Sequence, residues 1–294
     1  MNSNVTIVIP VYNEELNIGS VIENIINYCD SLIIVDDHSS DKTLEILNQF
    51  QSKYMNKIIL LKNNKNKGIG YTVKKGFSKA LELENEIVIK FDGDNQHMAE
   101  DIPKFVDKII KENYDFVKGN RFLNSEYSQP MPNLKIIGNL ITTSLQKIVS
   151  GNYKISDPNN GFLAVKKQKL RLIDFGKLKN NYYFENSLLI YVSSLGMKIG
   201  EVPIKTIYGK EKSSIPIFRA SIKLIPTFLM FFYLRNILNA RFNLSINSII
   251  FFLFTIIVFL NIFFNNINLW IIGLVLFLSY LFIDILNFIN KNDK

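Results

Sequence analysis

Two carboxylates separated by one residue are the sequence feature best suited to metal or phosphate chemistry. Asp92 and Asp94 flank Gly93 and follow an Ile-Val-Ile run at residues 87–89. Carboxylates at this spacing can reach one hard cation, directly or through water. Mg²⁺ or Mn²⁺ held there would neutralise charge on phosphate oxygens. An acidic surface turn would have the same sequence. The position of the pair in the fold therefore has to distinguish a metal site from a surface turn.

The segments that must position these residues alternate short apolar runs with helical patterns. Strands are predicted at residues 5–9, 32–35, 58–61 and 87–89. Helices are predicted at residues 18–26, from residue 42, and from about 70 to 83. Continuous Val/Ile/Leu strands between helices indicate an α/β protein with a largely parallel sheet covered on both faces. Ligands bind beyond the carboxyl ends of such strands, where Tyr12, Asp36-Asp37 and Asp92-Asp94 all lie.

Beyond Arg121 the pattern is less regular. We expect helices at residues 139–149 and 185–195 and strands at residues 161–165 and 198–204. Pro158, Gly161, Gly196 and Pro203 stand at the connections between these segments.

The C-terminal part has the composition of a membrane hairpin. Residues 242–283 contain no charged side chain, and the apolar stretches 246–264 and 269–289 are each near the ~20 residues that cross a bilayer core. Basic residues flank the hairpin on its outer sides, which places both flanks in the cytoplasm. A buried hairpin in a soluble protein is the alternative. Residues 216–241 mix apolar and basic side chains and predict amphipathic helices at the membrane surface, or a helix packed on the preceding domain.

Composition favours the cytoplasmic side of a membrane. The chain has one cysteine, Cys29, which excludes an internal disulfide framework. Its first residues lack the basic and apolar regions of a secretory signal, so we expect the N-terminal domain and both termini in the cytoplasm. The net charge of +8 suits anionic lipids or phosphorylated substrates, and basic clusters such as 62–67 indicate solvated turns rather than a nucleic-acid surface.

Several motifs together resemble those of the family 2 glycosyltransferases. They are Val-Ile-Pro-Val-Tyr-Asn-Glu-Glu at 8–15, Ile-Val-Asp-Asp-His-Ser-Ser-Asp-Lys-Thr at 34–43, Asn-Lys-Gly at 66–68 and Asp-Gly-Asp-Asn-Gln-His at 92–97. Within that family, Asp-Pro-Asn-Asn-Gly-Phe at 157–162 and the terminal hairpin resemble the dolichyl-phosphate mannose synthases and bacterial polyprenyl-phosphate glycosyltransferases. The resemblance implies a GT-A domain, a Rossmann-like nucleotide-diphosphosugar transferase fold, at residues 1–215. Interfacial helices at 216–241 and a two-helix transmembrane hairpin at 242–294 would follow.

The resemblance also implies roles for individual residues. The nucleotide-sugar would be bound by Pro10, Tyr12, Glu14, Asp36, Asp37, Lys67, Asp92, Gly93 and Asp94. The metal, Mg²⁺ or Mn²⁺, would be held by Asp92, Asp94 and Gln96. A helix-capping turn is the structural alternative for Asp36-Asp37. For His97 a hydrogen-bonding role is favoured over a role as ligand.

On the acceptor side, the resemblance implies a polyprenyl phosphate, either dolichyl or undecaprenyl. Arg121, Lys210 and Lys212 would contact its phosphate. Besides Asp94, the candidate catalytic carboxylates are Asp157, which could instead cap the turn before Pro158, and Glu185. Other family members have an acidic pair near Glu185, whereas this sequence has Glu-Asn.

The function expected from these features is inverting transfer of a hexose from a nucleoside-diphosphate sugar, of GDP-mannose or UDP-glucose type, to polyprenyl phosphate at the cytoplasmic face. Transfer to a lipid-linked oligosaccharide or glycolipid is one alternative. A non-catalytic nucleotide-binding membrane scaffold is another. The sequence leaves open the sugar and whether the protein forms a homo-oligomer.

Overall fold

The computed structural model covers two long parts of the chain and several shorter ones. The residues it describes are 4–124, 133–205, 229–230, 232–233, 235–237, 246–264 and 267–292. Lys210, Lys212 and most of the predicted interfacial region 216–241 lie outside these residues.

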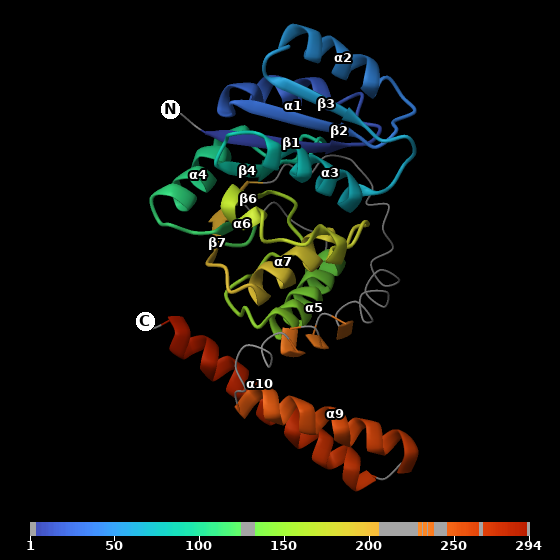
Figure 1. Cartoon of the computed structure of the whole chain (residues 1–294), viewed down its shortest axis with the longest axis vertical. Coiled ribbons are helices and arrows are strands. Elements are labelled where there is room, and N and C mark those ends of the chain that lie inside the picture. Colours follow the sequence, from blue (N-terminus) through green and yellow to red (C-terminus); the bar gives the residue numbers. More distant parts are fainter. Residues whose placement is uncertain are drawn as a thin grey trace.

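One mixed sheet forms the centre of the N-terminal part (Figure 1). In the described residues its strands are β1 (Val5–Val11), β2 (Ser31–Asp36), β3 (Ile58–Lys62), β4 (Ile87–Lys90), β5 (Phe116–Asn120), β6 (Leu163–Lys166) and β7 (Ile199–Pro203). Their order is β3-β2-β1-β4-β6-β5-β7. The four strands predicted from apolar runs, β1 to β4, are parallel neighbours. β6 is antiparallel to both β4 and β5, so the sheet is less uniformly parallel than the sequence indicated.

Helices cover both faces of the sheet. The helices of this part are α1 (Ile18–Ile25), α2 (Thr43–Lys53), α3 (Ile69–Glu82), α4 (Ile102–Ile110), α5 (Asn133–Ser150), α6 (Lys167–Leu170) and α7 (Phe184–Ser194), with short 3₁₀ turns η1 (Ile26–Tyr28), η2 (Ala99–Asp101) and η4 (Phe175–Lys177). Of these, α5 packs on α7. The buried apolar residues of α1, α2 and α4 form one core with the sheet, and those of α3, α6 and α7 form a second core on the opposite face. α3 packs closely because Gly76 has no Cβ, which would lie 2.3 Å from Val8 Cγ1 of β1.

The C-terminal part is a pair of apolar helices, α9 (Ile246–Phe264) and α10 (Ile267–Asn292), which pack along each other below the sheet domain (Figure 1). Within α10, residues Ile267–Asn287 are long and apolar enough to cross a membrane, with a mean hydropathy of 2.4. The described part of α9 contains a shorter apolar segment, Ile246–Asn261. The structure thus confirms a C-terminal helix pair with one candidate span, and the crossing of the membrane by α9 stays a prediction.

A third, smaller core joins this helix pair to the sheet domain. Phe251 of α9 and Tyr280 of α10 are buried together with Val149 of α5, Ile190 of α7 and Phe232. α5 and α7 therefore lie between the sheet and the helix pair, as Figure 1 shows.

Candidate active site

The carboxyl ends of three parallel strands bring polar residues to one edge of the sheet. β1 lies between β2 and β4 and is parallel to both. Tyr12, Asp37 and Asp92 follow these strands at adjacent ends. Tyr12 leaves 47% of its surface exposed, whereas Asp37 leaves only 3%. At this edge an exposed aromatic ring therefore lies near a buried carboxylate, Asp37, and a partly exposed one, Asp92.

Asp37 holds the loop that follows β3. Its Oδ1 accepts from Asn63 Nδ2 at 2.7 Å and from the Lys67 amide at 2.9 Å, and its Oδ2 accepts from the Gly68 amide at 2.8 Å. Gly68 has φ +86°, a conformation that glycine adopts without strain because it has no Cβ. The Lys67 side chain points to Tyr71, whose hydroxyl lies 3.1 Å from Nζ. Asp37 thus fixes the position of Lys67 through the backbone.

Other residues predicted for the nucleotide-sugar surround this edge. Pro10 is buried within β1. Asp36 is fully buried; its Oδ1 accepts from the Ser39 amide at 3.1 Å, and no hydrogen-bond partner for Oδ2 is found in the described part of the chain. Glu14 accepts from Asn17 Nδ2 at 2.9 Å. The structure brings these residues together, and their contact with a nucleotide stays a prediction.

Asp92 has a polar side-chain partner on each of its carboxylate oxygens. Lys90 Nζ donates to its Oδ1 at 2.6 Å, and His97 Nε2 lies 3.2 Å from its Oδ2. Lys90 is fully buried and forms a second ion pair with Glu185 Oε1 at 3.0 Å. Burial disfavours the ionised form of Asp92, but Lys90 and the hydrogen bond to His97 outweigh it and hold the pKa of that carboxyl well below its usual range. Asp92 is therefore ionised at neutral pH.

The environment of Asp94 shifts the pKa of its carboxyl in the opposite direction. Its Oδ1 accepts from the Gln96 amide at 3.1 Å, and buried Gly93 separates it from Asp92. Burial, together with the charge of Asp92, raises the pKa of Asp94 above its ordinary value. The two carboxylates thus repel each other, and a divalent cation would relieve this repulsion.

The donor set at this turn fits Mg²⁺ or Mn²⁺. In the part of the chain that the structure describes, no group of three or more His, Cys, Asp or Glu side chains converges as metal ligands. Mg²⁺ commonly takes one or two carboxylates and completes its shell with waters and substrate phosphates. Asp92 and Asp94 supply such a pair, and Gln96 as a third ligand stays a prediction.

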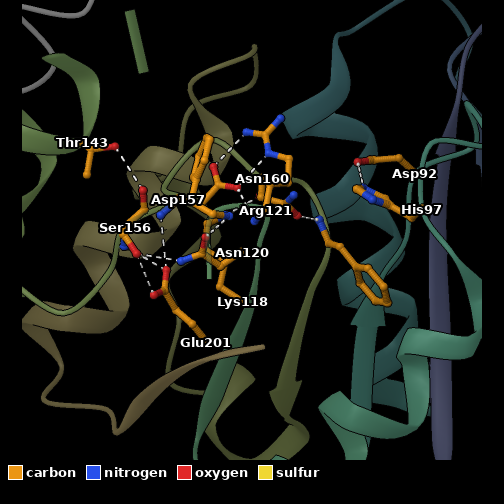
Figure 2. A network of polar contacts seen from close by, with 12 residues as sticks. Asp92, His97, Lys118, Asn120, Arg121, Thr143, Ser156, Asp157, Asn160 and Glu201 are labelled. Atoms are coloured by element: carbon orange, nitrogen blue, oxygen red, sulfur yellow. Dashed lines mark hydrogen bonds and ion pairs between the residues drawn. The ribbon is translucent and has the colours of Figure 1, made fainter. Parts of the chain in front are cut away.

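Arg121 and Asp157 form a bidentate ion pair, on the side of the site away from Asp92 and His97 (Figure 2). Arg121 Nε and Nη2 each donate at 2.8 Å, to Oδ2 and Oδ1 of a fully buried Asp157. Glu201 Oε1 accepts from the Ser156 and Asp157 amides at 2.9 and 3.3 Å, and Asn120 Nδ2 donates to Ser156 Oγ at 2.7 Å. This scaffold fixes the guanidinium plane. In this geometry Asp157 positions Arg121, and its role as the acceptor-side carboxylate stays a prediction.

A second buried lysine lies beneath this pair. Lys118 of β5 donates through Nζ to the Asn160 carbonyl. Burial lowers the pKa of Lys118 to about 8, with Glu185 and Asp157 opposing the shift. Figure 2 shows Asn160 between the Arg121 side of the site and the Asp92–His97 pair.

Sequence reasoning missed three residues of this network. Lys90, Lys118 and Glu201 were not singled out, although a lysine inside an apolar run, as in Ile-Val-Ile-Lys-Phe, is an unusual signal of a buried charge. Apart from Asp92, which lies two residues from Lys90, their partners come from distant segments, so spacing along the chain could not reveal most of these contacts.

Comparison with protein-family models matches residues 6–173 to "Glycosyl transferase family 2". The chain belongs to this family. Asp92, Asp94, Arg121 and Asp157 all fall within the matched residues, and Glu185 follows them.

Two relatives of this glycosyltransferase illustrate the range of similarity. The UDP-N-acetylglucosamine–dolichyl-phosphate N-acetylglucosaminyltransferase of Methanococcus voltae is 35% identical over 214 residues, which are 69% of this chain and 85% of that protein. The dolichol-phosphate mannosyltransferase of Pyrococcus furiosus is 28% identical over 204 residues, which are 68% of this chain and 55% of that protein.

Solved structures confirm the fold. Glucosyl-3-phosphoglycerate synthase from Mycobacterium tuberculosis, in complex with Mn²⁺, uridine diphosphate and glucosyl-3-phosphoglycerate, aligns with a TM-score of 0.58. The alignment covers 77% of this glycosyltransferase and 79% of that chain at 18% identity. The predicted GT-A-like α/β domain is therefore confirmed.

Proposed function

We propose that this glycosyltransferase transfers a hexose, with inversion, from a nucleoside-diphosphate sugar to a polyprenyl phosphate at the cytoplasmic face of a membrane. The donor would lie along the strand-end edge, its nucleoside near Tyr12 and Asp37 and its diphosphate near Asp92 and Asp94. The acceptor would approach from the side of the C-terminal helices. Two relatives whose names include dolichyl or dolichol phosphate support this choice of acceptor.

One contact carries the proposal. The Tyr153 hydroxyl donates at 3.0 Å to Asp284 of α10, the helix with the candidate span. Four residues later, Asp157 holds Arg121. The short segment 153–157 thus links the apolar helix to a cationic group of the site, which would bring a membrane-bound phosphate close to the donor.

The chemistry suits an acceptor that is already charged. A phosphate oxygen of a polyprenyl phosphate is anionic at neutral pH, so it can attack the anomeric carbon while the nucleoside diphosphate leaves, with little need for a general base. Arg121, whose guanidinium plane is fixed by Asp157, would bind that phosphate, and Lys210 and Lys212 would add positive charge. A divalent cation on Asp92 and Asp94 would neutralise the charge that develops on the leaving diphosphate.

Within this proposal the chain has three parts. Residues 1–215 form the catalytic domain, 216–241 lie at the membrane surface, and α9 and α10, in 242–294, cross the membrane as a hairpin with both termini in the cytoplasm. Electrostatic attraction between the +8 chain and anionic lipid would favour this arrangement.

An acceptor panel tests the proposal. Purified full-length protein would be given labelled UDP-sugars and GDP-sugars, each with a short polyprenyl phosphate, the corresponding polyprenyl alcohol or a lipid-linked oligosaccharide. The expected result is a labelled lipid only with the phosphate. Labelling of the oligosaccharide alone would instead favour the glycolipid alternative. Binding of nucleotide without any labelled lipid would favour the non-catalytic scaffold.

A further inference from the structure

The buried ammonium group of Lys90 contacts residues from three segments of the chain. Its Nζ lies 2.6 Å from Asp92 Oδ1, 3.0 Å from Glu185 Oε1 and 3.2 Å from the Gly161 carbonyl oxygen. An ammonium has three N–H donors, and three acceptors surround this one. The side chain of Lys90 is completely buried. β4, the loop before β6 and the first turn of α7 therefore meet at a single charge.

The geometry leaves Asp92 little freedom. Lys90 holds Oδ1, and His97 holds Oδ2 at 3.2 Å. Behind the carboxylate, Gly161 approaches so closely that a Cβ there would lie 2.0 Å from Asp92 Oδ2 and 2.7 Å from Lys90 Nζ. The orientation of Asp92 is thus set by contacts from elements distant in sequence.

Charge explains why Glu185 is part of this cluster. Lys90 beside Asp92 alone would form a neutral pair, which attracts a cation weakly. Glu185 gives the Lys90 ammonium a second carboxylate partner, so Lys90 is shared between Glu185 and Asp92 instead of neutralising Asp92 alone. Glu185 lies 3.0 Å from Lys90, and no ion pair or hydrogen bond joins it directly to Asp92. Its effect on Asp92 therefore passes through Lys90.

We infer that Glu185 is a positioning residue, which acts through Lys90 to hold Asp92 in the orientation and at the charge that bind a divalent cation. This inference rests on the use of Asp92 for a cation in the proposed function. It differs from a role of Glu185 as general base, which would require contact with the acceptor. Removal of a group that contacts a metal ligand, as Lys90 contacts Asp92, typically changes metal affinity by about 10- to 100-fold, and Glu185 holds that group.

Mn²⁺ binding separates the two roles. The full-length protein in detergent would be titrated with Mn²⁺, with and without UDP, and free Mn²⁺ followed by electron paramagnetic resonance. Glu185→Gln keeps the shape of the side chain and an oxygen that can accept from Lys90. The expected result is a loss of Mn²⁺ affinity of about 10-fold or more. Glu201→Gln is the matched control, because Glu201 binds the Ser156 and Asp157 amides on the other side of the site, and its Mn²⁺ affinity should be unchanged.

A double-mutant cycle tests the coupling between the two side chains directly. In Lys90→Met/Glu185→Leu both charges are removed, so neither is left buried without its partner. Because Glu185 acts only through Lys90, adding Glu185→Leu to Lys90→Met should change Mn²⁺ affinity less than Glu185→Leu does alone. If Glu185→Leu changes Mn²⁺ affinity equally in the wild type and in Lys90→Met, Glu185 does not act through Lys90.

Three outcomes overturn the inference. They are unchanged Mn²⁺ affinity in Glu185→Gln together with lost sugar transfer, equal loss of affinity in Glu201→Gln, and absence of Mn²⁺ binding by the wild-type protein with and without UDP. If the wild-type protein binds Mn²⁺, Glu185→Gln weakens it and no lipid acceptor is glycosylated, the proposed function fails while the positioning role stands.

Discussion

At the scale of single residues, buried charges at the strand ends are balanced by partners from distant parts of the chain. Asp92, Asp94 and Arg121 could be singled out from the sequence because they follow apolar strands or match family motifs. Lys90 and Lys118 could not, because buried lysines are rare and, apart from Asp92 beside Lys90, their partners Glu185 and the Asn160 carbonyl are far away in sequence. Composition and periodicity carry no information about such pairs.

The close approach of Gly161 to Asp92 predicts the effect of one added methyl group. In Gly161→Ala, a Cβ would lie 2.0 Å from Asp92 Oδ2, which Lys90 and His97 hold in place. We expect Mn²⁺ affinity and sugar transfer to fall at least 10-fold, measured on the purified protein. Gly19→Ala is the control, since its Cβ would lie 3.5 Å from the nearest atom, an ordinary contact. Equal activity of the two variants would show that Asp92 moves without loss of function.

Lys118 predicts a pH dependence of stability. Its pKa is lowered from 10.5 to about 8 by burial, so between these values the unfolded chain binds the proton more readily than the folded chain. Its contribution to stability therefore rises as pH increases from 8 to 10.5, by about 3 kcal/mol at about 1.4 kcal/mol per pH unit, and is constant and unfavourable below pH 8. Lys118→Met should flatten this part of the curve of unfolding midpoint against pH. If the unfolding midpoint of the wild type and that of Lys118→Met change equally with pH between pH 8 and 10, the pKa of Lys118 is not lowered by burial.

At the scale of elements, the prediction was best for the four neighbouring parallel strands. Continuous apolar runs marked β1 to β4, and the structure confirms them as parallel neighbours. β5 was missed because Phe-Val-Lys-Gly-Asn has only two apolar residues, although all five residues are buried. Lys118 and Asn120 tolerate burial there because their polar atoms have hydrogen-bond partners. The antiparallel direction of β6 depends on connections that apolar periodicity does not report.

The loop after β3 provides a prediction at this scale. Asp37 accepts from Asn63 Nδ2 and from the Lys67 and Gly68 amides. In Asp37→Asn one acceptor oxygen becomes a donor, so at least one of these N–H groups loses its partner. An unpaired buried group costs about 1–3 kcal/mol, and we expect a lower unfolding midpoint as well as weaker nucleotide binding.

Tyr12→Ala is the comparison for that prediction. Tyr12 is 47% exposed, so its removal should weaken nucleotide binding while leaving the unfolding midpoint nearly unchanged. If Asp37→Asn also leaves the midpoint unchanged, the loop does not depend on Asp37.

At the scale of the whole molecule, a buried polar cluster ties the helix pair to the sheet domain. Asp284 of α10 pairs with Arg235 at 3.1 Å and accepts from Asn247 Nδ2 at 3.3 Å and from the Tyr153 hydroxyl at 3.0 Å. Arg235 also contacts the Tyr280 hydroxyl. The sequence identified the apolar stretches of this region, but not that Arg235 and Asp284 meet, because 48 residues separate them along the chain.

Removal of Asp284 should loosen this connection. Asp284→Leu leaves Arg235 buried without its carboxylate, and loss of one partner of a buried pair costs about 3–5 kcal/mol. We expect a lower unfolding midpoint and weaker transfer to polyprenyl phosphate, with nucleotide binding retained. Asp107→Asn, which breaks the exposed pair with Lys111, should change the midpoint little, because such pairs contribute about 0–1 kcal/mol. Undiminished lipid transfer by Asp284→Leu would mean that the helix pair serves only as an anchor.

The measurement that tests the central claim most directly is product formation from a labelled nucleotide-sugar and a short polyprenyl phosphate by the full-length protein. We expect a lipid of the mass of a polyprenyl monophosphosugar, formed in equal amount to the released nucleoside diphosphate. In Asp94→Asn, folded and membrane-bound as the wild type, this product should fall by about 100-fold or more. Full activity of Asp94→Asn, or release of nucleoside diphosphate without a sugar on the lipid phosphate for every donor, would contradict the account.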